Sequence, residues 1–311
     1  MRQGTISSEP YTSDAIDSNL TDQDDFTDQF NSVVDRIVSS AETYGTDTAF
    51  FLCTLPYYSS VGYLFDSEDL EFYLKKANSN YHLPPSFNKV VKNGAGMADY
   101  TTGDRVSLFT FYFMYLLLSD GASVEYVNRA LETDGAQRDG LVLSETELHH
   151  IMSRIDSFNE SIENAAAGLG PGVHYVDTGG YLNDVLTGSD TISVYGTTLS
   201  RSWGRGNSFT LDGVHPGYTG HALIANYILM HINETTGLNA PEQAPEDILA
   251  EDPYVDRDGD GWVPGPDYSP QGFTEILFLL KDPDDADPTV QPVLPANIWR
   301  YISDILLDDM R

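Results

Sequence analysis

Two predicted buried strands, each preceded by a segment with helical periodicity, constrain the fold of this chain most strongly. Their alternation with helices predicts an α/β fold with a parallel sheet. The first is TAFFLCTLP at 48–56, a continuous apolar run typical of a strand buried on both faces of a parallel sheet, and its helical stripe is Phe26, Phe30, Val33, Val34 and Ile37. The second is GVHYVDTGG at 172–180, and its stripe is Ile151, Ile155, Phe158 and Ile162.

The segments around these runs define the expected organisation. Ser144 and Glu147 are spaced as a capping box at the start of the second helix, and Gly168 is placed to end it. The segment 57–143 is Tyr-rich and irregular, and we interpret it as an insertion on one face of the domain. Cys53 is the chain's only cysteine and lies within the first apolar run, so we expect an inert, buried thiol.

The charge balance limits the partners of this chain. Its 311 residues carry 16 Lys and Arg against 48 Asp and Glu, a formal net charge of −32. A surface this acidic repels nucleic-acid phosphates and anionic membrane surfaces, so we expect neither as a partner. The longest apolar run, Leu108–Leu118, is too short to cross a bilayer and is predicted to be a buried helix.

An acid and an imidazole lie three positions apart in the turn LDGVHPG, just before an apolar helical pattern. Pro216 and Gly213 suit a rigid, tight turn that would hold Asp212 and His215 close together. Acyl-transfer hydrolases need a general base and a carboxylate that fixes its tautomer, which this pair could supply. The spacing alone is also compatible with a capped turn carrying an exposed histidine.

A family resemblance favours the catalytic interpretation. LDGVHPGYTGHALIAN resembles the last block of the SGNH/GDSL hydrolases, which are esterases and lipases with a flavodoxin-like, three-layer α/β/α fold. That resemblance implies that Asp212 and His215 complete a Ser-His-Asp triad that needs no cofactor for catalysis. The helix and strand before TLP, and the later helix and strand ending in VHYVDTGGYLNDV, are similar to the family in order and cover roughly 20–240.

The chain departs from the family at its nucleophile. It contains no GDS block, and the strings GSD at 188–190 and GDRVS at 103–107 have the wrong order and place. GYLND at 180–184 does not match the family's G-x-N-D block, which would supply an oxyanion donor. The first strands of the sheet are missing with these blocks. We therefore expect either a truncated N-terminus or a separately encoded partner segment.

An acidic tail over 241–311 holds 17 acidic and 4 basic residues. Within it, DRDGDGWVPGPD fits the calcium-loop pattern D-x-D-x-D-G with an acid at position twelve. The loop resembles those of dockerin-type and other bacterial extracellular calcium modules, with a structural Ca²⁺ as the expected ion. KDPDDADP at 281–288 lacks the glycine and is interpreted as a linker. The expected ligands are Asp256, Asp258, Asp260, the backbone carbonyl of Trp262, and Asp267.

These observations predict a hydrolase-like domain over 1–240, incomplete at its N-terminus, and a calcium-loop tail over 241–311. The expected function is ester hydrolysis of a small-molecule or lipid substrate. The alternative is a non-catalytic or fragmentary domain with a calcium-dependent structural or attachment role. Weak calcium loops suit the millimolar calcium outside cells, so we expect an extracellular or cell-envelope location. The first 25 residues nevertheless lack the apolar segment of a signal peptide.

Overall fold

The computed structural model describes residues 20–92, 98–132, 141–187, 192–194, 197–210, 212–244, 247–248, 252–253, 255–260, 262–264 and 281–292. Its helices are α2 (Gln23–Thr43), η1 (Tyr58–Ser60), α3 (Ser67–Ala77), α4 (Leu108–Ser119), α5 (Val124–Asn128), η2 (Arg129–Leu131), α7 (Glu145–Gly168), α8 (Thr178–Thr187) and α9 (Tyr218–Thr236). Its strands are β1 (Phe50–Cys53), β2 (Leu64–Phe65), β3 (Val91–Lys92), β4 (Ala98–Asp99), β5 (Arg105–Ser107), β6 (Val142–Leu143), β7 (Val173–Val176), β8 (Ser193–Val194) and β9 (Thr197–Thr198). In the parts of the chain just given, no helix is long and apolar enough to cross a membrane.

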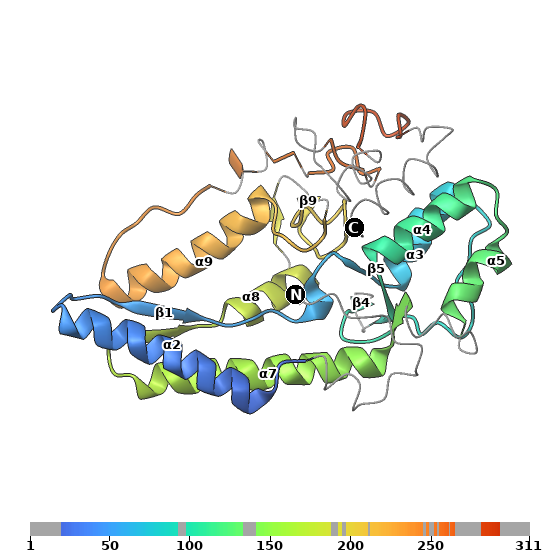
Figure 1. The fold of residues 1–311 in the computed structure, drawn as a ribbon. Helices are drawn as coiled ribbons and strands as arrows, with labels where there is room; N and C mark the ends of the chain where they lie inside the picture. Colours follow the sequence, from blue (N-terminus) through green and yellow to red (C-terminus); the bar gives the residue numbers. More distant parts are fainter. Residues whose placement is uncertain are drawn as a thin grey trace, which may run out of the picture.

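The two predicted strands are both present, and they pair with each other in parallel, in agreement with the predicted parallel sheet. β1 and β7 are hydrogen-bonded in register from Phe50 opposite Val173 to Cys53 opposite Val176. Figure 1 shows α2 and α7 together on one side of β1, with α9 on the other side. Ser144 and Glu147 make both hydrogen bonds of the predicted capping box at the start of α7. The α/β class is confirmed as a mixed fold with a small parallel sheet. The flavodoxin-like, three-layer arrangement stays a prediction.

The burial of β1 differs from the expectation. Phe50, Phe51 and Leu52 are half-buried, and Cys53 is exposed to solvent. Val34, Val38 and Ala166 of the helices α2 and α7 cover the face of Phe50 and Leu52. The prediction of a buried Cys53 was wrong, because the described residues bury one face of this strand better than the other.

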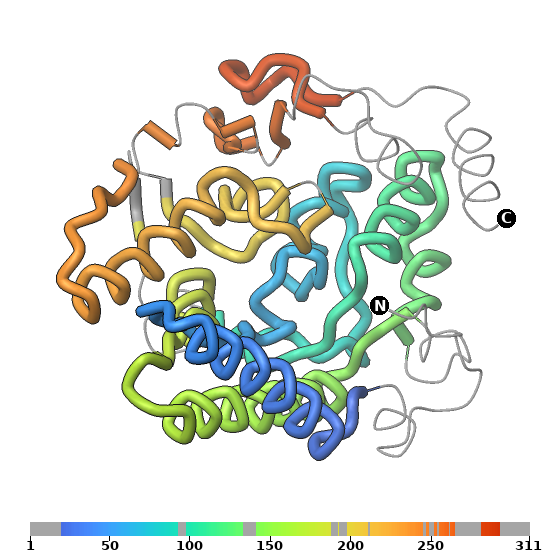
Figure 2. Tube along the Cα trace, turned by 60° about the vertical axis from the view of Figure 1, so that its left-hand side comes forward, coloured from blue at the N-terminus to red at the C-terminus, as the bar shows by residue number. Residues whose placement is uncertain are grey.

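The segment 57–143 contributes most of the largest hydrophobic cluster. The antiparallel sheet β2–β5–β6 and the helices α3 and α4 surround this cluster, and α4 is the helix predicted from the apolar run. Phe65 and Phe111 stack at 4.2 Å between ring centroids. Trp203 and Trp262 join the cluster from much later in the chain. Figure 2 shows the cyan and green part of this segment gathered on one side of the molecule.

A buried arginine connects this cluster to the segment that precedes α9. Arg201 is 0% exposed, and its Nη1 lies 2.6 Å from Asp66 Oδ2 and 3.0 Å from Asp69 Oδ2. Asp66 also caps α3, because its Oδ1 accepts from the backbone N–H groups of Glu68 and Asp69. The other guanidinium nitrogen, Nη2, donates to the carbonyl of Leu64. One side chain therefore fixes the start of α3 against the chain around residue 201.

Replacing this arginine tests how much the fold depends on it. Arg201→Met leaves two buried carboxylates without their main cation, and we expect the free energy of unfolding to fall by about 3–5 kcal/mol. Arg36→Met removes the same charge from an exposed position on α2 and should change it by less than about 0.5 kcal/mol. Urea denaturation followed by circular dichroism measures both variants. Equal, small losses in the two would contradict the role given to Arg201.

Candidate functional site

Asp212 and His215 lie on a tight hairpin that leads into α9. Phe209 and Pro216 are bridged in antiparallel fashion, and the Gly217 N–H donates to the carbonyl of Ser208 at 3.0 Å. The Thr210 N–H donates to the carbonyl of His215 at 2.9 Å. These contacts close residues 208–217 into a short loop, which is called the base hairpin below. The acid and the imidazole are thus held on one rigid turn.

The two side chains make direct contact in the way the sequence suggested. Asp212 Oδ2 lies 2.6 Å from His215 Nδ1. Asp212 Oδ1 accepts from the hydroxyl of Thr210 at 2.6 Å and from the N–H groups of Val214 at 2.9 Å and His215 at 3.0 Å. A carboxylate with this many donors acts as an acceptor toward the ring, so Nδ1 carries the proton. Nε2 is then the basic nitrogen.

Exposure and charge favour a reactive Nε2. The His215 side chain is 76% exposed, whereas that of Asp212 is 33% exposed. Partial burial raises the pKa of the Asp212 carboxyl, but hydrogen bonds from Thr210 and His215 outweigh this effect and leave the pKa lowered. The carboxylate is therefore ionised near neutral pH, and it can stabilise an imidazolium when His215 takes up a proton.

The base hairpin rests on the turn that follows η1. The Tyr63 N–H donates to the carbonyl of Gly213 at 2.7 Å. Gly213 has φ +68, and a Cβ atom there would lie 2.6 Å from Tyr63 N. A Cβ atom at Gly62 would lie 2.9 Å from the carbonyl oxygen of Arg201. Two glycines thus permit close backbone packing of the hairpin on the turn at Gly62, and of that turn on the backbone of Arg201.

An apolar cavity of about 290 Å³ lies beside the base hairpin. Thr54, which directly follows the strand β1, and Thr178, which begins α8 two residues after the strand β7, contribute to its wall. The crevice beyond the carboxyl ends of parallel strands is where ligands bind in open α/β sheets. The apolar part of its lining includes Val61, Leu182, Leu186, Phe209, Val214 and Leu223.

The serines of this cavity have other partners. The Ser60 hydroxyl donates to Asn183 Oδ1 at 2.7 Å, and the Ser208 hydroxyl donates to the carbonyl of Gly206 at 3.1 Å. Both serines are buried. Among the described residues that line the cavity, no serine hydroxyl is hydrogen-bonded to His215. The nucleophile that the resemblance requires is therefore not identified at this site.

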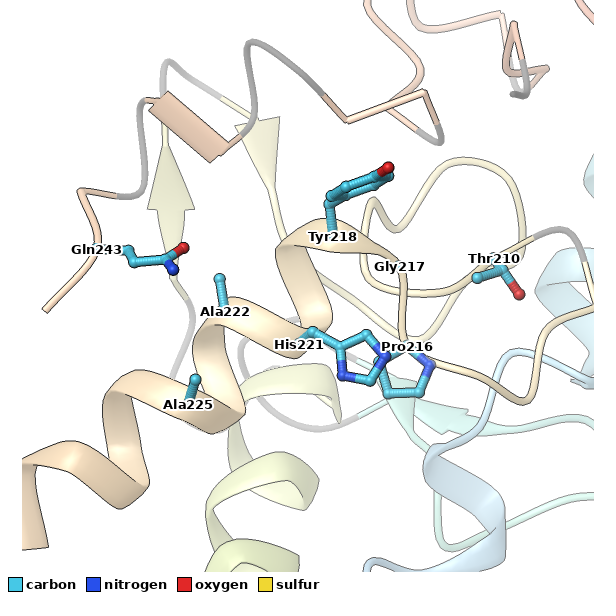
Figure 3. A pocket seen from close by; sticks show the side chains of 8 residues that line it. All are labelled: Thr210, Pro216, Gly217, Tyr218, His221, Ala222, Ala225 and Gln243. Carbon is cyan, nitrogen blue, oxygen red and sulfur yellow. The ribbon is translucent and has the colours of Figure 1, made fainter. Parts of the chain in front are cut away.

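A second hollow, of about 350 Å³, shares Pro216 with the lining of the first cavity (Figure 3). Figure 3 shows the His221 ring beside Pro216 at the start of α9, with Tyr218 on the preceding turn. His221 is exposed, and no carboxylate among the described residues contacts it in the way that Asp212 contacts His215. It serves below as the matched control for His215.

The predicted calcium loop brings its first three acids together. The carboxylates of Asp256, Asp258 and Asp260 lie within 4.8 Å of one another and could hold a metal ion. Trp262 lies two residues after Asp260, is 2% exposed, and packs against Tyr73 with 5.3 Å between ring centroids. The structure thus anchors the loop in the main core through Trp262. Asp267 and Gly261 lie outside the described residues.

Two further acids approach this group from a segment that the sequence pattern did not single out. Asp282 and Asp285 form a second cluster with Asp258, again within 4.8 Å. They belong to KDPDDADP, whose missing glycine led to its interpretation as a linker. Its closely spaced aspartates were the available signal, but a pattern confined to one loop does not detect ligands from a second segment. Burial raises the pKa of both Asp260 and Asp282, and neighbouring carboxylates add to this.

The close packing of the base hairpin can be tested at Gly213. Alanine at φ +68 costs about 1–2 kcal/mol, and the approach to Tyr63 adds about 1–3 kcal/mol. Gly237 has φ +70 with nothing within 4 Å of its Cβ position, so Gly237→Ala carries only the conformational cost. Thermal and urea denaturation should show the larger loss for Gly213→Ala. Equal losses would mean that the hairpin does not depend on this contact.

Comparisons of the chain with protein-family models, with curated proteins and with solved structures found no match. Two features of the described residues bear on the function. One is the Asp212–His215 contact beside an apolar cavity, and the other is the carboxylate cluster around Asp258.

Proposed function

We propose that this chain supplies the general base and the orienting acid of a serine-type ester hydrolase. The observation that carries the proposal is the 2.6 Å contact between Asp212 Oδ2 and His215 Nδ1, with the imidazole exposed at the mouth of the hairpin. This is the arrangement that a Ser-His-Asp triad needs from its second and third members. The resemblance of LDGVHPGYTGH to the SGNH/GDSL hydrolases points to the same roles.

In this proposal His215 moves the proton and Asp212 orients the ring. A serine hydroxyl attacks the ester carbonyl while His215 Nε2 takes its proton. His215 then gives that proton to the leaving alcohol, which yields an acyl-serine. Water repeats the two steps and releases the carboxylic acid. Asp212 stays ionised and stabilises the imidazolium throughout, and the mechanism requires no cofactor.

The nucleophilic serine is proposed to come from a segment outside these 311 residues. Ser60 and Ser208 of the cavity are buried and engaged elsewhere. Among the described strands, β7 alone pairs with β1, which leaves the other edge of β1 open to a further parallel strand. Added strands there would extend the sheet toward the flavodoxin-like, three-layer arrangement. They would also bring their carboxyl ends to the edge where the cavity lies.

The cavity supports an ester with an apolar acyl or alcohol group as substrate. Its volume of about 290 Å³ lies close to the lower end of the range of small-molecule sites. Side chains such as Leu182, Phe209 and Leu223 would contact that group. A small-molecule or lipid ester with one short apolar chain fits this description.

The proposal predicts a serine label that depends on His215. A tagged form of the chain, isolated without denaturation from the organism that encodes it, is treated with a fluorophosphonate probe and assayed with p-nitrophenyl esters. His215→Ala should lower both labelling and hydrolysis by at least about 10³-fold, because the base is lost. Asp212→Asn should lower them strongly as well, since the ring loses its orientation.

His221→Ala is the control, because it removes a neighbouring exposed imidazole without touching the Asp212 contact. It should keep most of the activity. Mass spectrometry of the labelled peptide identifies the serine and shows whether it lies within this sequence. If no serine is labelled, or if labelling survives His215→Ala, the hydrolase assignment fails. The non-catalytic alternative then stands.

We also propose that the acidic loop binds Ca²⁺ as a structural ion. The clustering of Asp256, Asp258 and Asp260 within 4.8 Å favours a hard cation that takes oxygen ligands. The backbone carbonyl of Trp262 and the carboxylate of Asp267 are the remaining ligands that the loop pattern suggests. A structural calcium of modest affinity would suit an extracellular or cell-envelope location, where calcium is millimolar.

Removing calcium should therefore destabilise the protein. At a calcium concentration near 100 times the dissociation constant, the bound ion contributes about 2.7 kcal/mol, which corresponds to a few degrees in Tm. Differential scanning calorimetry with calcium and then with EDTA measures this shift. The double variant Asp258→Asn and Asp260→Asn should lose the shift. An unchanged Tm of the parent chain on addition of EDTA would contradict the calcium proposal.

A further inference from the structure

The carboxylates around Asp258 come from two segments of the chain. Asp256 and Asp260 belong to the loop before Trp262, whereas Asp282 and Asp285 lie some twenty residues later, and Asp258 lies within 4.8 Å of both pairs. In Figure 2 the red-orange segment 281–292 lies at the top of the molecule, next to the orange loop. We infer that Asp282 and Asp285 are ligands of the calcium site, so that one cation centre joins the two segments. This inference rests on the proposed binding of calcium.

Contacts outside the cluster already align the two segments. The Asp282 N–H donates to the carbonyl of Val263 at 2.8 Å. The Arg257 N–H donates to Asp285 Oδ1 at 2.9 Å, and the Arg257 guanidinium lies 2.5 Å from Asp285 Oδ2. These contacts place the second segment beside the loop without help from an ion. The fold itself therefore brings the carboxylates of the two segments together.

The carboxylates also retain buried oxygens that lack a partner. Asp260 and Asp282 are each only 6% exposed. Among the described residues, the Oδ2 atoms of Asp258, Asp260 and Asp282 are buried and have no hydrogen-bond partner. A buried charged oxygen without a partner is costly, so native structures pair such groups or place a metal ion among them. Ca²⁺ takes six to eight oxygens in flexible geometry, and these three carboxylates offer it oxygens from both segments.

Arg257 and Lys76 do not reach these oxygens. Arg257 contacts Asp285 and the backbone carbonyl of Asp252. The Lys76 ammonium donates to the backbone carbonyl of Asp260 and lies 4.8 Å from the ring centroid of Phe72. Among the described residues, the Oδ2 atoms of Asp258, Asp260 and Asp282 therefore receive no hydrogen bond from either of these two cations. A divalent cation would supply the missing positive charge.

The joined segments hold both ends of the base hairpin. On one side, the Asp256 N–H donates to Asn207 Oδ1 at 2.9 Å, directly before Ser208. On the other side, Asp252 Oδ2 accepts from the N–H of Thr219 at 2.9 Å and from its hydroxyl at 2.7 Å, in the first turn of α9. An ion that fixes residues 252–260 on the second segment therefore steadies the hairpin that carries Asp212 and His215.

The test compares two aspartates of the same segment. Isothermal titration of Ca²⁺ into the chelator-stripped full chain is carried out on the parent, Asp282→Asn and Asp284→Asn. Asp284 is exposed and belongs to neither cluster, so its variant is matched in charge and position. Asp282→Asn should weaken calcium binding at least about tenfold, as expected for a lost metal contact, and Asp284→Asn should stay within about twofold. The loss of calcium affinity in Asp285→Asn should lie between those of the other two variants, because Arg257 already forms an ion pair with the Asp285 carboxylate.

Melting temperatures distinguish a ligand from a merely structural residue. With EDTA, Asp282→Asn should melt at or above the parent temperature, because one unpaired buried charge is removed. With calcium it should melt below the parent. Calcium should also slow hydrogen exchange at the N–H groups of Thr210 and Gly217 in the parent but not in Asp282→Asn. A variant that loses stability equally in both conditions would assign Asp282 to folding alone and overturn the inference.

The outcomes separate the two proposals. If the parent chain binds no calcium, both the calcium site and its two-segment form are wrong. If the parent binds calcium and Asp282→Asn binds it as tightly as Asp284→Asn does, calcium binding stands. In that case the second segment is not part of the site.

Discussion

The buried Arg201 is the interaction on which the candidate site depends. Its guanidinium joins Asp66 and Asp69 at the start of α3, and its backbone lies under Gly62. Desolvation of a guanidinium and two carboxylates is expensive, so such a group adds more to the uniqueness of the arrangement than to net stability. Here the arrangement it specifies is the turn after η1, and the base hairpin rests on that turn through Gly213. The position of His215 therefore follows from a contact between residues far apart in the sequence.

The same packing and hydrogen bonds support both the Asp212–His215 pair and the carboxylate cluster around Asp258. Trp203 and Trp262 pack in one hydrophobic cluster, at 6.3 Å between ring centroids. Asn207 and Thr219, which flank the base hairpin, are hydrogen-bonded to the acidic loop through Asp256 and Asp252. A change in the acidic loop is thus transmitted to the hairpin by two buried hydrogen bonds instead of a flexible linker. Through this physical connection, the proposed calcium ion would stabilise the hairpin of the proposed hydrolase without taking part in its chemistry.

Features formed by residues close together in the sequence were predictable, whereas contacts between residues far apart in the sequence were not. Neighbouring residues in the sequence form the capping box of Ser144 and the Asp212–His215 contact, and strong sequence patterns predict the strands β1 and β7. The ion pair of Arg201 joins residues more than 130 positions apart, and no periodic pattern in the sequence predicts it. The approach of Asp282 to Asp258 was not predicted for the same reason. The pattern of the single loop already supplies a set of calcium ligands, so it does not indicate further ligands from another segment.

The mismatch at β1 bears on the proposed origin of the nucleophile. Its sequence, FFLC, reads as a strand covered on both faces, yet these residues are half-buried or exposed, with Cys53 facing solvent. A run this apolar at the edge of a sheet would be an aggregation risk if it stayed open, because its backbone groups can pair with another chain. Its pattern is better matched to an interior strand with a neighbour on each side. Thr54, just after the carboxyl end of β1, lines the cavity together with Val214 and Pro216 of the base hairpin, so an added parallel strand would end near the position that the proposal gives to the serine.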